Sequence, residues 1–255
     1  MTAGTPRQPI VVIPARLAST RLPGKPLADI HGAPMIVHVW RRAVEAAVGP
    51  VLVACGDAPI AEAVRKAGGE AVLTRADHPS GSDRVFEAMQ TVDPDGRHDA
   101  VVNLQGDLPT VDPQAIRACL APLDEPAVDI GTIATLIASQ EERQNPNMVK
   151  AAVAFAEPRP GKPPIGRALY FSRLPVPAGE GPHYHHVGIY AFRRAALSRF
   201  IALPPVPLER RERLEQLRAL EAGMRIDVAL VDSAPFGVDT PADLARARAI
   251  LTPKT

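Results

Sequence analysis

A basic loop near the start of the chain carries side chains suited to binding phosphate. Residues 14–26 read PARLASTRLPGKP and include the cations Arg16, Arg21 and Lys25, while the first acid of the chain is Asp29. Arginine grips phosphate oxygens through two parallel hydrogen bonds, and lysine supplies a compact positive charge. A solvated basic loop is the alternative, since charged residues usually face water. The loop directly follows a β-branched run typical of a buried strand, and this position favours a polyphosphate site.

Two aspartates far apart in the sequence could hold a metal ion. Asp107 lies just beyond the predicted strand Val101–Leu104, and Asp239 precedes Thr240 and Pro241. Mg²⁺ prefers oxygen ligands and bridges carboxylates to substrate phosphates, so two acids from separate loops suffice chemically. Each aspartate could instead cap a helix or stabilise a turn. Spacing alone leaves both interpretations open.

Strand and helix patterns alternate through the first half of the chain. The predicted strands are Ile10–Ile13, Val51–Cys55, Ala71–Leu73 and Ala100–Leu104. Helices are predicted from Pro34 onward, over Pro59–Ala67, around Val85 and Met89, and over Pro113–Leu120. This alternation predicts an α/β fold with a mainly parallel sheet covered on both faces. Ligands of such sheets bind beyond the carboxyl ends of the strands, where the basic loop and Asp107 fall.

The pattern changes after Gly131, where strand candidates follow one another with little helix between them. They are Thr132–Ile137, Val149–Phe155, Ala168–Phe171 and Val187–Phe192, with a proline-rich loop at 157–166. A helical pattern over Leu208–Leu220, a strand over Ile226–Val231 and a helix over Pro241–Leu251 follow. We therefore expect one domain over residues 1–255, with a mainly parallel central sheet and an inserted antiparallel subdomain over about 130–215.

Composition excludes several classes of function. The chain has 29 Lys and Arg against 28 Asp and Glu, so no global field would hold nucleic acid or an anionic membrane. Its two cysteines, Cys55 and Cys119, suit a reducing compartment and are too few for a disulfide framework. No apolar run approaches the roughly 18 residues of a membrane span. We expect a soluble cytoplasmic protein.

Seven segments in order along almost the whole chain carry a family resemblance. They are PARLASTRLPGKPL in the first loop, RADHPSGSDR at Arg75–Arg84, VVNLQGDLP at Val101–Pro109, ALYFSR at Ala168–Arg173, HVGIY at His186–Tyr190, LEQLR at Leu214–Arg218 and GVDTP at Gly237–Pro241. Together they closely resemble the 3-deoxy-manno-octulosonate cytidylyltransferase family. The resemblance implies a Rossmann-like nucleotidyltransferase that transfers CMP from CTP to the anomeric hydroxyl of 3-deoxy-manno-octulosonate (Kdo), releasing pyrophosphate and activating Kdo for lipopolysaccharide biosynthesis.

The resemblance also implies Mg²⁺ as cofactor, a homodimer, and roles for individual residues. The family's catalytic residues match Arg16, Lys25, Asp107 and Asp239, of which Asp107 and Asp239 match its magnesium ligands. Its nucleotide contacts match Pro14, Ala15, Arg16, Arg21, Lys25, Ser80, Gly81, Arg84, Gln105 and Asp107. Its sugar-acid contacts match Gln105, Arg173, His186, Tyr190, Glu215 and Gln216. From the residues alone, Ser80 could simply cap a helix, and Glu215 and Gln216 could be a solvent-facing pair on one.

One departure from the family pattern leaves alternatives open. The family usually has an acid at the position of Leu108, and a leucine cannot bind a metal ion or water there. Two alternatives therefore stay open. The protein could transfer CMP to another acceptor, such as neuraminate, an 8-amino analogue of Kdo or an isoprenoid precursor. It could instead be a nucleotide-binding relative without catalytic activity. A P-loop hydrolase and an NAD-dependent oxidoreductase are disfavoured, because neither GxxxxGK followed by Ser or Thr nor GxGxxG is present.

Overall fold

The computed structural model describes residues 4–155, 161 and 163–252. The chain contains two compact units. We call Gln8–Ile116 together with Pro235–Thr255 the N-terminal unit, and Met1–Arg7 together with Arg117–Ala234 the central unit. The chain passes from the N-terminal unit to the central unit within helix α4 (Pro113–Leu120).

The N-terminal unit is built on a parallel sheet with the strand order β5-β4-β1-β6. Its strands are β1 (Pro9–Ala15), β4 (Val51–Cys55), β5 (Glu70–Leu73) and β6 (Ala100–Asn103). Strands β1, β4 and β6 read as continuous apolar runs because both of their faces are covered. The four strands agree with the predicted ones to within one or two residues at each end.

The strand order places the first loop and the loop after β6 next to each other. From β1 the chain builds outward through β4 to β5, and then returns to place β6 on the other side of β1. The carboxyl ends of β1 and β6 are therefore neighbours at a point where the order reverses. Such a reversal opens a crevice beyond the strand ends, which is where open α/β sheets bind ligands.

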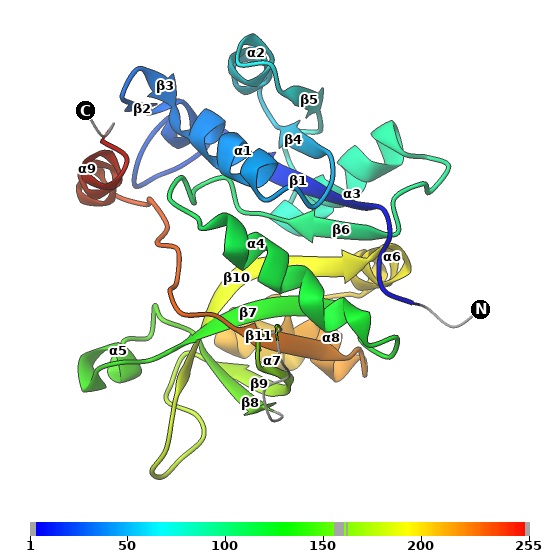
Figure 1. Ribbon diagram of the computed structural model, residues 1–255, viewed down its shortest axis with the longest axis vertical. Helices are drawn as coiled ribbons and strands as arrows, with labels where there is room; N and C mark the ends of the chain where they lie inside the picture. The colour runs from blue at the N-terminus through cyan, green and yellow to red at the C-terminus, as the bar shows by residue number, and fades with distance from the viewer. Residues whose placement is uncertain (1–3, 156–160, 162, 253–255) are drawn as a thin grey trace. The chain divides into compact units, whose positions relative to one another are not determined.

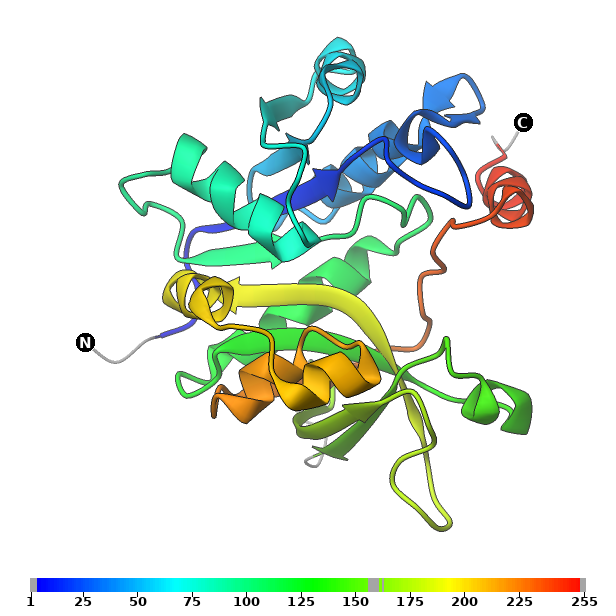
Figure 2. The same ribbon diagram turned by 180° about the vertical axis from the view of Figure 1, so that it is seen from behind.

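Helices of the N-terminal unit cover both faces of its sheet. They are α1 (Met35–Glu45), α2 (Ala58–Lys66), α3 (Gly81–Val92) and α9 (Pro241–Ile250), with a short 3₁₀ helix η1 (Lys25–Leu27) and a hairpin of β2 (Asp29–Ile30) and β3 (Ala33–Pro34). Helix α1 lies in front of β1 in Figure 1, and α3 lies in front of it in the reverse view of Figure 2. The prediction of a parallel sheet covered on both faces is confirmed.

The central unit contains the predicted antiparallel strands. They are β7 (Ile130–Leu136), β8 (Lys150–Phe155), β9 (Ile165–Ser172), β10 (Tyr184–Arg193) and β11 (Ile226–Leu230). Their order is β10-β7-β11-β9-β8, and all neighbours are antiparallel except β7 and β11. Strand β8 also pairs with β10. The expected combination of a mainly parallel sheet with antiparallel strands is thus confirmed.

Helical segments of the central unit differ from the prediction. They are η2 (Ala121–Asp124), α5 (Gln140–Gln144), α6 (Arg194–Ala202), α7 (Pro207–Glu212) and α8 (Leu217–Glu221), and Figure 2 shows α7 and α8 in front of the strands. The single helix predicted over Leu208–Leu220 is wrong, because Arg213 adopts a left-handed conformation with φ of 56° that ends α7. Helices α5 and α6 were not predicted. Most of the proline-rich loop at 157–166 lies outside the described residues.

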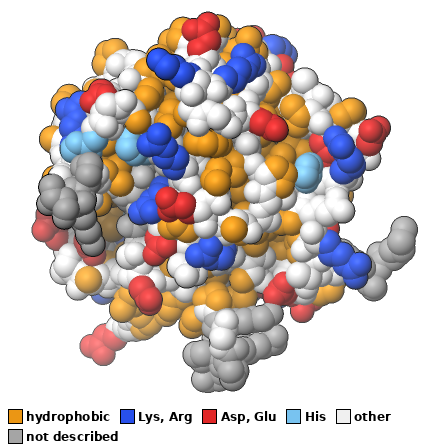
Figure 3. Space-filling model, turned by 45° about the horizontal axis from the view of Figure 1, so that its top comes forward, with side chains coloured by type: hydrophobic (Ala, Val, Ile, Leu, Met, Phe, Trp, Pro, Cys, Tyr) orange, Lys and Arg blue, Asp and Glu red, His pale blue; other side chains and the backbone are white. Residues whose placement is uncertain are grey.

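Surface charge is distributed as the composition predicts. On the face drawn in Figure 3, Lys and Arg side chains are interspersed with Asp and Glu side chains. In the described part of the chain, no helix is both long enough and apolar enough to span a bilayer.

Candidate active site

A cleft of about 710 Å³ opens at the strand reversal of the N-terminal unit. The loop after β1, the start of α3, the loop after β6 and Asp239 form its walls. All ten residues predicted to contact nucleotide line it: Pro14, Ala15, Arg16, Arg21, Lys25, Ser80, Gly81, Arg84, Gln105 and Asp107. Volumes of roughly 300–1,000 Å³ are usual for small-ligand sites. The topology therefore gathers into one cavity segments that are separated by more than two hundred positions in the sequence.

Lys25 joins the two predicted metal ligands. Its Nζ donates to Oδ2 of Asp107 at 2.8 Å and to Oδ1 of Asp239 at 3.0 Å. Arg21 Nη2 lies 2.9 Å from the other carboxylate oxygen of Asp239. Burial alone would lower the pKa of Lys25, but its interactions with Asp107 and Asp239 outweigh burial and raise that pKa. The ammonium is therefore held in its charged form.

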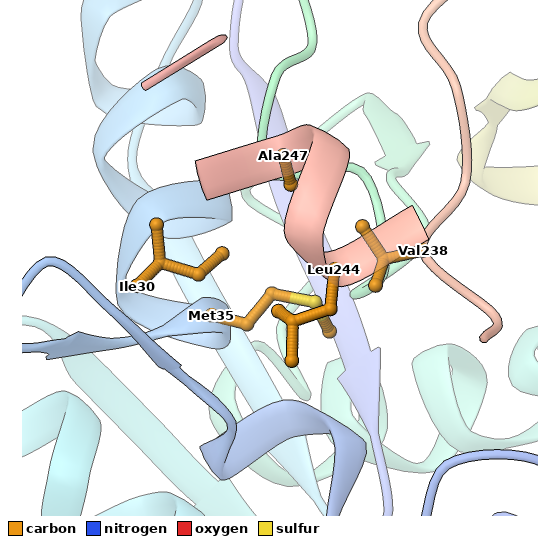
Figure 4. Close-up of a cluster of buried hydrophobic side chains, with 5 residues drawn as sticks. All are labelled: Ile30, Met35, Val238, Leu244 and Ala247. Carbon is orange, nitrogen blue, oxygen red and sulfur yellow. The ribbon is translucent and has the colours of Figure 1, made fainter. Parts of the chain in front are cut away.

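Backbone and core packing fix the position of Asp239. The Val238 N–H donates to the carbonyl oxygen of Asp107 at 2.9 Å, which ties the two acidic segments together. Figure 4 shows Val238 in a buried cluster with Ile30 and Met35 and with Leu244 and Ala247 of α9. Thr240 caps α9, so Asp239 does not cap this helix.

The start of α3 forms the wall of the cleft that includes Ser80 and Gly81. Ser80 caps the helix by accepting from the Asp83 N–H, which confirms the simple capping role. Arg84 is buried, and its guanidinium donates to Thr74 Oγ1 and to the carbonyl oxygens of Arg75 and Ala76. Burial, and then repulsion from Arg16, lower the pKa of Arg84. Arg84 thus braces the 74–76 loop at the edge of the cleft.

Two further polar side chains in the cleft have fixed orientations. His78 bonds through Nε2 to a carboxylate oxygen of Glu87 on α3. Gln105 donates from Nε2 to Asn103 Oδ1 at 3.2 Å. Hydrogen bonds of this kind hold a side chain in one rotamer before a ligand arrives, which favours selective recognition.

The carboxylate pair fits a hard divalent cation. Asp107 and Asp239 already converge on one cationic nitrogen, and both are partly exposed to the cleft. Among the described residues, no group of three or more His, Cys, Asp or Glu side chains is gathered as a complete metal site. Mg²⁺ commonly takes one or two carboxylates and fills its remaining positions with water and substrate phosphates.

Gly106 also lines the cleft, although it was not among the predicted site residues. An added Cβ would lie 2.8 Å from the Pro14 carbonyl oxygen, so the loop after β6 packs directly on the end of β1. The sequence indicates this role through the position of Gly106 between Gln105 and Asp107, because a glycine there permits a close approach of the backbone.

Substitution of Gly106 tests this packing. We expect Gly106→Ala to lower the free energy of unfolding by about 1–3 kcal/mol and kcat/KM by up to about 10², because the loop after β6 must move away from the end of β1. Gly237→Ala is the matched control, since no described heavy atom lies within 4 Å of its added Cβ. Urea unfolding and initial rates measure both effects, and similar values for the two variants would contradict the packing argument.

The predicted sugar-acid residues other than Gln105 lie in the central unit. His186 is buried on β10, with its Nε2 3.1 Å from Thr132 Oγ1, and its ring contacts those of Phe171 and Tyr190. Burial, and secondly His185, lower the pKa of His186 to about 3. Burial and Glu215 raise the pKa of Tyr190. Both side chains are therefore neutral hydrogen-bonding groups at physiological pH.

The low pKa of His186 predicts a pH-dependent stability. An unfolded histidine titrates near about 6.5, so below that pH the unfolded chain binds a proton that the folded chain does not. The contribution of neutral His186 to the free energy of unfolding is complete above about pH 6.5. As the pH falls towards about 3, this contribution is lost by up to about 1.4 kcal/mol per pH unit. His186→Gln should weaken the fall in unfolding free energy between about pH 6.5 and 5. An equal fall in both proteins by urea denaturation would contradict this assignment.

Arg173, Glu215 and Gln216 lie near the ends of α7, α8 and β9. Arg173 donates to the carbonyl oxygens of Glu212, Arg213 and Pro146. Glu215 and Gln216 occupy the turn between α7 and α8, so their predicted position within a continuous helix is wrong. Gln216 is 6% exposed, which excludes a solvent-facing pair.

The departure at Leu108 has a structural explanation. The Leu108 side chain is 7% exposed and does not line the cleft. An apolar side chain suits this buried position, so the loss of an acid removes no group from the cleft wall described above.

The chain is similar to proteins of one family over nearly its whole length. A family model described as cytidylyltransferase matches residues 10–226. A 3-deoxy-manno-octulosonate cytidylyltransferase from Paramagnetospirillum magneticum is 66% identical over 95% of this chain and 97% of its own length. One from Rhodospirillum centenum is 66% identical over 100% of this chain and 97% of its own. A solved structure of CMP:2-keto-3-deoxy-manno-octonic acid synthetase complexed with CTP matches with a TM-score of 0.87 and 41% identity, covering 96% of this chain and 98% of that one.

Proposed function

Because the chain belongs to the 3-deoxy-manno-octulosonate cytidylyltransferase family, we propose that it transfers CMP from CTP to the anomeric hydroxyl of Kdo and releases pyrophosphate. The observation that carries this proposal is the cleft of the N-terminal unit. It combines three cations from one loop with two acids from distant segments, a combination suited to a triphosphate.

The reaction needs positioning and charge stabilisation rather than a covalent intermediate. The Kdo anomeric hydroxyl gives up its proton to solvent as its oxygen attacks the α-phosphorus in line, and the bond to pyrophosphate breaks on the opposite side. Arg16, Arg21 and Lys25 line the cleft and would stabilise the charge that develops on the α-phosphate and the leaving group. Ser80 and Gly81 would contact the nucleotide at the start of α3, because the N-terminus of a helix favours anions.

We propose Mg²⁺ as the cofactor, held by Asp107 and Asp239. When bound, the ion would neutralise phosphate charge and make the α-phosphorus more electrophilic. The convergence of both carboxylates on Lys25 Nζ supports this assignment. Their two segments are linked by the bond between Val238 N and the Asp107 carbonyl, which keeps the carboxylates together.

We assign the sugar acid to residues of the central unit. Neutral His186 and Tyr190 can donate hydrogen bonds to hydroxyl or carboxylate oxygens, and buried Gln216 adds an amide. Each guanidinium nitrogen of Arg173 donates one N–H to a backbone carbonyl. Two of its five N–H groups can then donate to the Kdo carboxylate.

Assembly and location extend the proposal. We infer a homodimer, supported by the exposed Leu136, Leu169 and Leu174 of the central unit, which are 59–68% exposed. Light scattering would show about twice the chain mass.

We also infer a cytoplasmic enzyme whose product supplies activated Kdo for lipopolysaccharide biosynthesis. The reduced, buried Cys55 and Cys119 suit that compartment.

Product analysis tests the reaction directly. The protein is incubated with Mg²⁺, Kdo and each nucleoside triphosphate in turn, and products are identified by mass. We expect CMP-Kdo from CTP alone. Neuraminate and 8-amino-Kdo are then compared as acceptors, and faster turnover with either would reassign the substrate. Absence of pyrophosphate release with every acceptor would favour a non-catalytic nucleotide-binding protein.

A further inference from the structure

Lys25 is engaged by the same carboxylates that are proposed to hold the metal ion. Its Nζ lies 2.8 Å from Asp107 Oδ2 and 3.0 Å from Asp239 Oδ1, and its side chain is 15% exposed. The proposed reaction, however, needs this ammonium on the phosphates and these oxygens on the metal. Lys25 can bind phosphate while Asp107 and Asp239 bind the metal ion only if the Lys25 ammonium first leaves the two carboxylates.

Charge balance shows when that change is favourable. Asp107 and Asp239 carry two negative charges, and Lys25 and Arg21 supply two positive charges within 3.0 Å of them. A divalent cation arriving alone would displace Lys25 and leave unpaired positive charge in a partly buried cleft. A cation arriving with a triphosphate brings the anion that the displaced ammonium can bind.

The local structure allows the ammonium to move while the carboxylates stay. Lys25 opens the short helix η1 directly after Gly24, whose φ is 67°, and its flexible side chain lines the cleft beside Arg16. Asp107 and Asp239 are held by the backbone bond between Val238 N and the Asp107 carbonyl and by the buried cluster around Val238. The backbone that carries the two carboxylates is therefore held independently of Lys25.

We propose that Lys25 acts as an exchangeable counter-ion: it occupies the carboxylate pair in the empty cleft and transfers to phosphate when the divalent cation and CTP bind together. This inference rests on the magnesium site of the proposed function. The cation and CTP then bind with positive coupling, and linkage makes that coupling reciprocal. Couplings of this kind are typically about 5- to 150-fold.

Metal binding without turnover tests the exchange. Mn²⁺ replaces Mg²⁺ as a probe, and its affinity is measured by electron paramagnetic resonance or calorimetry, with and without CTP and in the absence of Kdo. For the wild type we expect weak binding alone and about 5- to 150-fold tighter binding with CTP. Lys25→Met should bind Mn²⁺ alone about tenfold or more tightly than the wild type, with most of the CTP-dependent gain lost.

Two variants separate exchange from a general effect of charge or folding. Arg16→Met removes one positive charge from the same cleft, but no ion pair joins Arg16 to a carboxylate among the described residues, so Mn²⁺ binding alone should rise far less. Lys25→Arg keeps the cation and should retain weak binding. Thermal melting confirms that each variant is folded.

The outcomes distinguish this inference from the proposed metal site. If the wild type binds Mn²⁺ with CTP but Lys25→Met gains no affinity in its absence, the exchange is wrong and the metal site stands. If Arg16→Met gains as much as Lys25→Met, the effect is one of net charge, and the exchange is again wrong. If the wild type binds no Mn²⁺ even with CTP, both proposals fail.

Discussion

Asp107→Asn should lower kcat/KM for CMP transfer by about 10²–10³ while leaving the protein folded. The amide cannot supply the negative charge that Mg²⁺ requires, whereas the Asp107 backbone carbonyl still accepts the Val238 N–H. Continuous measurement of pyrophosphate release with CTP and Kdo gives the rate, and circular dichroism checks the fold. Mn²⁺ affinity measured with CTP should fall in parallel.

The matched control is Asp95→Asn, which removes an exposed carboxylate from the same unit. Its rate should stay close to that of the wild type. Normal turnover by Asp107→Asn would show that Asp107 holds no metal needed for the reaction. A parallel loss in both variants would indicate a general dependence on surface charge.

Lys25→Ala should also cripple turnover, by about 10²–10³ in kcat/KM, because one cationic contact to the reacting phosphates is lost. The effect should appear in kcat as well as in KM if the contact strengthens in the transition state. Lys25→Arg should recover part of the rate, since a cation remains but its geometry differs. Initial rates over a range of CTP concentrations separate the two constants.

Lys66→Ala provides the control for Lys25→Ala, because Lys66 is an exposed lysine at the end of α2 in the same unit. It should leave both constants near their original values. If Lys25→Ala released pyrophosphate at a nearly normal rate, the role proposed for Lys25 in catalysis would be wrong. Both variants should remain folded, since neither side chain belongs to the apolar core.

Local patterns predicted most strands of the molecule but not all of its helices. Buried strands such as Val51–Cys55 are continuous apolar runs, and the predicted and observed bounds coincide. The region Leu208–Leu220 has helical spacing throughout, yet the left-handed Arg213 divides it. The sequence does not reveal a non-glycine residue in the left-handed conformation, because the surrounding packing imposes that conformation.

Chemistry suited to a triphosphate follows from the sequence by itself. The types and order of Arg16, Arg21 and Lys25 after a buried strand are local features, and family resemblance then named the remaining residues. These features can be recognised in the sequence because binding of phosphate depends on charge and on the position of a loop after a strand.

Only the tertiary structure decided which groups touch. The contact of Lys25 with both Asp107 and Asp239 depends on the reversal of strand order at β1 and on the packing of α9 near β2. The burial that keeps His186 neutral likewise depends on Phe171 and Thr132 from other strands. Contacts between segments far apart in the chain are set by the collective packing of the core, and no local pattern encodes their distances.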